Sequence, residues 1–314
     1  MRDKLFLAVF LLGAGVLLFL GRGLMQSSVI VTWGIAFGST TAVAVLGVLL
    51  YRFRLELEAS RHEIARTEAE LSFARKVQQE LFPRQLPDSG GLEFSAVCIP
   101  ARGISGDYYD VVQLAGGELV FTVADISGKG ISAAILMANL QALLRVFAAI
   151  GPSPRDVCRL LNKHLHQVIG ESRFATMFYA QWNPSERRLC YVNAGHNPPI
   201  LIGRAGNRLL TTGGMPLGIF PDVQFEMEQL ELGGGEVLVL YSDGITEARS
   251  SEGSGDEEFG DKRLEALVSS LREAPPREIQ KRVLEAVRAW SGAESEDDMT
   301  LMIVKAKSDG RRPV

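Results

Sequence analysis

Residues 119–130 read LVFTVADISGKG. Four of the first five residues are apolar or aromatic, a composition that predicts a buried strand. The run reaches Asp125, a Ser-Gly-Lys-Gly turn follows, and an apolar segment that predicts a long helix begins at Ile131. A carboxylate at a strand end, next to glycines and ahead of a helix, can hold a cation that faces a phosphate group. The same pattern also fits a turn or a helix cap, because Asp favours both positions.

Three further segments place an aspartate at one end of an expected strand. Residues 106–110 read GDYYD, residues 241–244 read YSDG after an apolar run, and residues 297–300 read DDMT before another apolar run. Mg²⁺ and Mn²⁺ prefer hard oxygen ligands, which Asp supplies at short reach. Four carboxylates brought together would repel one another unless cations lay between them. The four segments together therefore predict a site for divalent metal ions.

The rest of the chain alternates between short strand-like runs with turns and helical segments. Many short strands with two pairs of helices predict an α/β (α+β) fold in which two antiparallel sheets pack together with helices outside. The expected strands are residues 92–99, 108–114, 119–123, 175–182, 187–193, 200–202, 209–211, 224–230, 237–241 and 299–304, and the expected helices are 131–150, 155–168, 262–272 and 276–290.

Length, charge and cysteine content limit the classes of function that the chain could have. The chain has 314 residues, enough for one catalytic domain with an appendage. Its net charge of −4 gives no support to a nucleic-acid partner. The three cysteines, Cys98, Cys158 and Cys190, have neither paired nor zinc-ligand spacing, so they are expected to be reduced thiols in a cytosolic domain.

Two apolar segments, residues 5–20 and 29–50, lie near the start of the chain. A helix needs about 20 apolar residues to cross a bilayer, so the second segment is long enough and the first is borderline. A signal peptide is the alternative for the first segment. Basic residues flank the pair on both outer sides, which predicts a multi-pass hairpin in the inner (cell) membrane with both ends cytoplasmic. These flanking residues are Arg2, Lys4, Arg52 and Arg54, and Arg22 lies between the segments.

Residues 51–82 contain neither Gly nor Pro, and Leu57, Ile64 and Leu71 recur every seven residues. This thin apolar seam predicts a helix that forms a parallel coiled coil in a homodimer. A solvated single helix with charge pairs is the alternative. The predicted organisation is a membrane hairpin (1–51), a helical linker (52–86), a catalytic domain (87–307) and a tail (308–314).

Six motifs occur in order along the chain: GDYYD (106–110), VADISGKG (123–130), NAGHNPP (193–199), GMPLGI (214–219), YSDGITEA (241–248) and EDDMT (296–300). With these motifs the chain resembles the metal-dependent serine/threonine phosphatases of the protein-phosphatase-2C (PP2C) type. It is most similar to their bacterial branch, typified by the sporulation stage II phosphatase and the phosphatases that regulate sigma factors. The resemblance extends over about residues 74–305.

The resemblance implies an αββα sandwich that binds two Mn²⁺ or Mg²⁺ ions. Two such ions can hold a water as hydroxide and polarise a phosphoryl oxygen, so no covalent enzyme intermediate is needed. Asp298 replaces the commoner Asn and is expected to act behind the ligands. The implied metal ligands are Asp107, Asp125, Asp243, Asp297 and the backbone carbonyl of Ile126.

Other positions depart from the family pattern or leave two interpretations open. Arg102 has the spacing of the family's phosphate-binding arginine, although it could equally be a surface residue. Ser127 stands where the larger family often has a histidine, which leaves the general acid unassigned. His196, before Asn197 and two prolines, is expected to make a structural hydrogen bond, and Asp110 is expected to be structural.

The sequence thus predicts a membrane-anchored phosphatase that acts on phosphoserine or phosphothreonine. The resemblance implies a phosphorylated regulatory protein, such as an anti-sigma-factor antagonist, as its substrate. The alternative is a catalytically weak phosphatase-like domain that binds phosphoproteins or dimerises in signalling. A nucleotide cyclase would need a nucleotide-binding motif, and the GxxxxGK[ST] pattern is absent around Lys129.

Overall fold

The structure is a computed structural model, and it describes residues 13–16, 18–19, 22, 29–101, 103–170, 173–251, 257–292 and 297–308. It divides into two compact units, Met1–Glu70 and Leu71–Val314. Most of the first expected membrane segment, residues 5–20, lies outside the described residues, and so does Arg102.

Helix α2 spans Val29–Gln79 without a break and contains the second apolar segment. By length and composition alone, its part Trp33–Gln79 could cross a membrane, and no part of the apolar window is buried in the protein. The helix ends before Pro83 rather than at residue 82, because proline disfavours the helical conformation of the residue before it.

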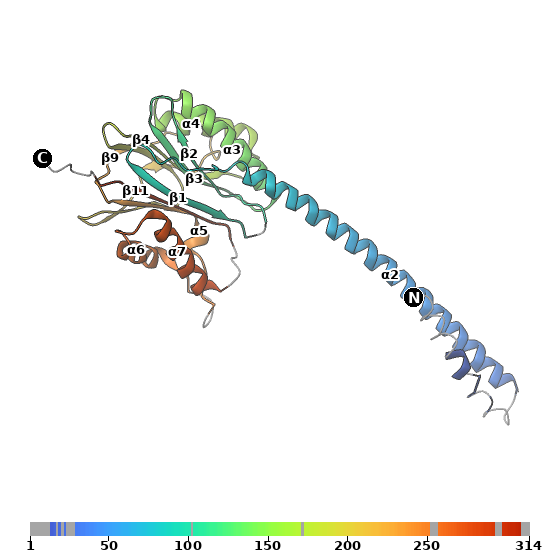
Figure 1. Cartoon of the computed structure of the whole chain (residues 1–314). Helices are drawn as coiled ribbons and strands as arrows, with labels where there is room; N and C mark the ends of the chain where they lie inside the picture. The colour runs from blue at the N-terminus through green and yellow to red at the C-terminus, as the bar shows by residue number, and fades with distance from the viewer. Residues whose placement is uncertain are drawn as a thin grey trace. The chain divides into compact units, whose positions relative to one another are not determined.

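The second unit contains two sheets built mainly from antiparallel pairs (Figure 1). The first sheet has the strand order β1 (Leu92–Ile99), β11 (Met299–Ala306), β10 (Val237–Tyr241), β6 (Ile200–Ile202) and β7 (Asn207–Leu209). The second has the order β2 (Tyr108–Gln113), β3 (Leu119–Ile126), β4 (Ala175–Asn183), β5 (Arg188–Ala194) and β8 (Gly213–Gly214), with β9 (Glu228–Glu231) also paired to β5.

Helices cover the outer face of each sheet, so the predicted αββα sandwich is confirmed (Figure 1). Helices α3 (Ile131–Ile150) and α4 (Pro154–Val168) pack on the β2–β5 sheet, and the short α5 (Asp243–Thr246) lies against β11. Helices α6 (Gly260–Ser270) and α7 (Pro276–Ser291) pack on the other sheet. The core between the sheets contains Phe121, Phe178, Leu240 and Met302.

Helix α3 also has the length and composition of a membrane span. It is instead a core helix on one side, because Met137, Leu140 and Leu144 are fully buried against the sheet. An amphipathic core helix and a spanning helix share the same apolar content, and only packing distinguishes them.

Two expected strands were wrong in position. The strand expected at 209–211 is β7, Asn207–Leu209, and the strand expected at 224–230 is β9, Glu228–Glu231. The apolar residues that led to both expectations, Leu210 and Phe225, are indeed buried. They fill the cores beside the strands, because burial of a side chain does not require its backbone to join a ladder.

Candidate metal centre

Asp107 and Asp125 meet at the end of the β2–β3 pair. The last paired residues of β2 and β3 are Tyr108 and Ala124, which places the two aspartates opposite each other at the next position. The amide of Ile126 donates to the carbonyl of Gly106 at 3.3 Å and continues the pairing past them. A Cβ on Gly106 would lie 3.0 Å from the Ile126 carbonyl oxygen, so glycine permits this close approach.

A second strand pair brings Asp243 and Asp297 to the same region. Beyond the last β10–β11 pair, the amide of Ser242 donates to the carbonyl of Thr300 at 3.0 Å. Asp243 then begins α5 and Asp297 lies just ahead of β11. A Cβ on Gly244 would lie 2.2 Å from the carbonyl oxygen of Asp298, so only glycine fits between the two segments.

The electrostatics show that these carboxylates are neighbours. Burial, then the charge of Asp125, raises the pKa of Asp107 well above its usual value. Burial, then the charges of Asp243 and Asp297, raises the pKa of Asp125 to about 6. Burial and Asp297 also raise the pKa of Asp243. Like charges held together in this way favour protonation or a bound cation.

Three observations bear on whether the site could bind a metal ion. Oδ2 of Asp107 is buried without a hydrogen-bond partner, as expected of an oxygen that awaits a cation. The ammonium group of Lys129 lies 2.8 Å from Oδ2 of Asp297, and its charge offsets part of the rise in the pKa of Asp243. Across the residues that the structure describes, no three His, Cys, Asp or Glu side chains form a ready metal-binding group. The carboxylate oxygens of the four aspartates are hard donors of the kind that Mg²⁺ and Mn²⁺ prefer.

Asp298 uses its carboxylate to hold the segment that leads to Asp107. Its Oδ2 accepts from the hydroxyl of Ser105 at 2.7 Å and from the amide of Gly106 at 3.0 Å. Its Oδ1 accepts from the amide of Ala101 at 2.8 Å. With both oxygens engaged by the protein, Asp298 is placed to position ligands rather than to bind an ion.

Other singled-out residues lie elsewhere in the structure. Asp110 is buried and accepts from Arg145 at 2.8 Å and from the Tyr108 hydroxyl, which makes it part of the packing between β2 and α3. His196 is buried with Nδ1 2.9 Å from the Thr176 hydroxyl, and its amide donates to Asn193. Burial lowers the pKa of His196 to about 4, so its ring is neutral near pH 7.

Sequence reasoning missed several polar residues around Asp107. The buried hydroxyls of Ser242 and Thr300 face it and partly offset the rise in its pKa. Ser242 directly precedes Asp243, and Thr300 lies two residues after Asp298, so their position within these two motifs was the available signal. Gln78 and Ser105 carried no such signal, because nothing in the sequence indicates that they meet.

An αββα sandwich in which one strand pair of each sheet ends on carboxylates is the arrangement of a PP2C-type phosphatase domain. Residues 115–307 match the family model described as Stage II sporulation protein E (SpoIIE). Phosphoserine phosphatase RsbU of Bacillus subtilis (strain 168) is 30% identical over 261 residues, which cover 82% of this chain and 76% of the relative. The chain belongs to the SpoIIE family and is a metal-dependent serine/threonine phosphatase of the PP2C type.

Solved structures agree with this fold. The SiaA-PP2C domain of Pseudomonas aeruginosa has a TM-score of 0.68 at 17% identity and covers 77% of this chain and 97% of that domain. RsbX, solved in complex with magnesium, has a TM-score of 0.54 at 17% identity and covers 70% of this chain and 98% of RsbX. At these identities the two structures show the shared fold alone.

Proposed function

We propose that this chain is a membrane-anchored phosphatase that hydrolyses phosphoserine or phosphothreonine on a regulatory protein by means of two divalent ions. The observation that carries the proposal is the position of Asp107, Asp125, Asp243 and Asp297 at neighbouring strand ends, where burial and then their mutual repulsion raise the pKa of Asp107, Asp125 and Asp243. Membership of the SpoIIE family supports the reaction class.

The proposed ligands are the four aspartates and the carbonyl of Ile126. The magnesium bound by the related RsbX supports Mg²⁺ or Mn²⁺ as the ions. When bound, two such ions supply a hydroxide from water near neutral pH and polarise the phosphoryl oxygens. Asp107 and Asp125 would hold the ions from the β2–β3 end of one sheet, and Asp243 and Asp297 would hold them from the β10–β11 end of the other.

Protonation of the leaving group is assigned to no side chain, and water or the substrate itself would supply the proton. Ser127, at the family's frequent histidine position, accepts from the amide of Phe174 at 2.8 Å. Its own amide donates to the Phe174 carbonyl at 2.9 Å. Both contacts hold Ser127 in its loop, so its hydroxyl has a structural partner instead of a catalytic one. Arg102 is proposed to bind the substrate phosphate, on the basis of its spacing from Asp107 alone.

The proposed substrate is a phosphorylated anti-sigma-factor antagonist. The relative RsbU carries the name of a phosphoserine phosphatase, which supports a phosphoserine protein as the substrate class. The chain's net charge of −4 offers no match to a nucleic acid, so a protein partner is favoured.

The anchor is proposed to be a hairpin of residues 5–20 and 29–50, with the catalytic domain in the cytoplasm. The apolar side chains along the second segment support it, because Phe37, Leu46 and Leu49 are 77%, 56% and 57% exposed. Lipid would cover these side chains, whereas water would leave them exposed at a large cost in free energy.

A homodimer through the linker is proposed on similar grounds. Leu57 and Ile64 of the predicted seam are 41% and 55% exposed on α2. A second copy of the helix would bury both in a coiled coil. The four-part organisation, with boundaries at residues 51, 86 and 307, completes the proposal.

One observation favours the second candidate, a catalytically weak domain that binds phosphoproteins or dimerises. Lys129 already pairs with Asp297, one of the proposed metal ligands. If the ions bind too weakly to displace Lys129, the domain would recognise phosphoproteins without hydrolysing them.

Phosphate release from a panel of phosphorylated anti-sigma-factor antagonists decides between the two. The full chain in detergent micelles is assayed with Mn²⁺, with Mg²⁺ and with a chelator. Release that requires either ion supports the phosphatase, whereas phosphoprotein binding without release at any ion concentration supports the second candidate.

A further inference from the structure

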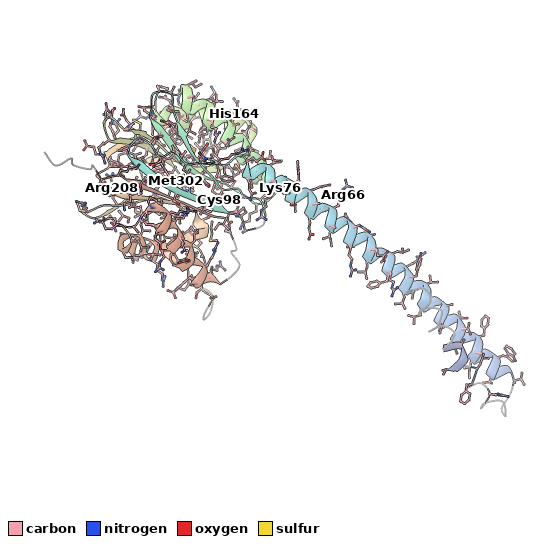
Figure 2. The ribbon with its side chains drawn as sticks, in the orientation of Figure 1. Arg66, Lys76, Cys98, His164, Arg208 and Met302 are labelled. Atoms are coloured by element: carbon pink, nitrogen blue, oxygen red, sulfur yellow. The ribbon has the colours of Figure 1, made fainter. Side chains whose placement is uncertain are left out.

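The side-chain amide of Gln78 is buried and forms two hydrogen bonds with the backbone of Ser105. Nε2 of Gln78 donates to the Ser105 carbonyl at 2.7 Å, and the Ser105 amide donates to Oε1 of Gln78 at 3.0 Å. Gln78 is 6% exposed although it lies in the last turns of α2, where its neighbours Val77 and Gln79 are exposed. Lys76, labelled in Figure 2, marks the same end of the helix.

Ser105 also forms hydrogen bonds with two aspartates of the candidate metal centre. Its hydroxyl donates to Asp298 at 2.7 Å and accepts from the amide of Asp107 at 3.0 Å. The thiol of Cys98, on β1, lies 3.5 Å from the same hydroxyl. Ser105 is therefore held by Gln78 through its backbone and by Asp298 through its side chain, two residues before the proposed ligand Asp107.

A second contact reaches the other side of Asp107. The ring of Phe82, three residues after α2 ends, lies 5.1 Å from the ring of Tyr109 and 6.1 Å from that of Tyr108. Tyr108 follows Asp107 directly. The end of α2 and the residues after it thus contact the chain both before and after this aspartate.

Only a neutral amide can make the contact seen at Ser105. A peptide group needs one acceptor and one donor, and Gln supplies both on one planar group. A Glu side chain would place a carboxylate against the Ser105 carbonyl, and an apolar side chain would leave the amide and carbonyl of Ser105 without these partners in a buried place.

We propose that Gln78 is a positioning residue that holds Asp107 in place for metal binding and thereby connects α2 to the metal centre. The proposal rests on the proposed function for the identity of Asp107 as a ligand. It assigns the connection to one side chain and its two hydrogen bonds with Ser105.

The test compares Gln78→Met with Gln79→Met in the full chain in detergent micelles. Met has a helix propensity similar to that of Gln and fills a similar volume without hydrogen bonds. Gln79 is exposed one residue further on, so the second variant makes the same chemical change without touching Ser105. Three quantities are measured: Mn²⁺ affinity by electron paramagnetic resonance, amide hydrogen exchange of Ser105–Asp107, and phosphate release at limiting and saturating Mn²⁺.

For Gln78→Met we expect Mn²⁺ affinity to fall about tenfold, which equals about 1.4 kcal/mol. Exchange at Ser105–Asp107 should be faster in the metal-free protein, and saturating Mn²⁺ should restore turnover. Gln79→Met should match the wild type in all three quantities. Wild-type affinity and exchange in Gln78→Met would overturn the proposal, as would a loss of turnover that saturating Mn²⁺ does not restore.

The outcomes separate this proposal from the proposed function. A wild-type chain that binds Mn²⁺ but releases no phosphate contradicts the proposed function, while affinity and exchange still decide the role of Gln78. A wild-type chain that binds no Mn²⁺ overturns both, because Asp107 would then have no ion to hold.

Discussion

Asp107 and Asp125 lie opposite each other one position beyond the β2–β3 ladder, and burial together with the charge of Asp125 raises the pKa of Asp107. Two facing carboxylates at the end of an antiparallel pair concentrate negative charge there. Their repulsion opposes folding, so burial of apolar side chains elsewhere in the sandwich must outweigh it. The repulsion becomes a favourable interaction when a cation lies between them.

Gly244 permits the approach of the second strand pair, which makes it a sensitive position. Gly244→Ala would place a Cβ 2.2 Å from the carbonyl oxygen of Asp298, and backbone must move to relieve the contact. We expect a loss of about 1–3 kcal/mol in the free energy of unfolding, typical of overpacking, together with lower metal-dependent turnover. Urea denaturation and phosphate release measure the two effects.

Gly116→Ala is the matched control, because a Cβ there meets nothing within 4 Å. Equal stability and turnover in the two variants would show that the Gly244 contact does not position the site.

His196 predicts how stability depends on pH. Burial lowers its pKa in the folded state to about 4, from 6.5 in the unfolded chain. The unfolded state therefore binds a proton first as the pH falls, so this contribution to stability is complete above pH 6.5 and is lost between about pH 6.5 and 4. The gap of about 2.5 pH units corresponds to about 3 kcal/mol.

Urea denaturation across this pH range measures the effect, with His196→Gln as the comparison. The variant lacks the titrating ring, so its stability should fall less steeply between pH 6.5 and 4. Parallel pH profiles for the two proteins would contradict the neutral, buried ring.

The topology of the proposed membrane hairpin is open to a direct test. Basic residues flank both outer ends, so the amino and carboxyl termini should both be cytoplasmic. A cytoplasmic reporter fused at the carboxyl terminus should be active, and a periplasmic reporter at the same place should be silent. The reverse pattern would mean a single crossing or the opposite orientation.

The linker should transmit helix rotation to the catalytic domain. In a series of variants, the residues before Leu71 are replaced by a strong parallel coiled coil, and the junction is lengthened by one residue from each variant to the next. A step of one residue turns the helix by about 100°, so turnover at limiting Mn²⁺ should rise and fall with the phase. Equal turnover in all variants would show that the linker only attaches the catalytic domain to the membrane segment and does not regulate its activity.

The grouping of the carboxylates could be predicted from the sequence, because each one stands next to a strand of contiguous apolar residues. The end of such a strand can be located from a few neighbouring residues, and the ends of paired strands lie side by side. The contact between Gln78 and Ser105 could not be predicted, because it joins residues 27 apart through a helix whose weak apolar pattern hides which glutamine is buried. The ion pair of Lys129 with Asp297 joins residues 168 apart and was equally hidden.

The two shifted strands have a related cause. Leu210 and Phe225 signal burial, and the sequence pattern does not distinguish a buried residue in a ladder from one beside it. Asp298 was expected to lie behind the ligands, and its contacts with Ala101, Ser105 and Gly106 are consistent with that prediction. Whether the four aspartates bind metal remains a prediction.

Mn²⁺ binding and phosphate release by Asp125→Ala test the central claim most directly. Asp222→Ala, at an exposed aspartate of the same domain, is the control. Because Asp125 is partly buried among like charges, we expect Asp125→Ala to lose Mn²⁺-dependent hydrolysis of phosphoserine while its metal-free domain stays folded and as stable as the wild type or more so. A folded Asp125→Ala protein, verified by circular dichroism, that binds Mn²⁺ and releases phosphate like the wild type would contradict the assigned metal centre.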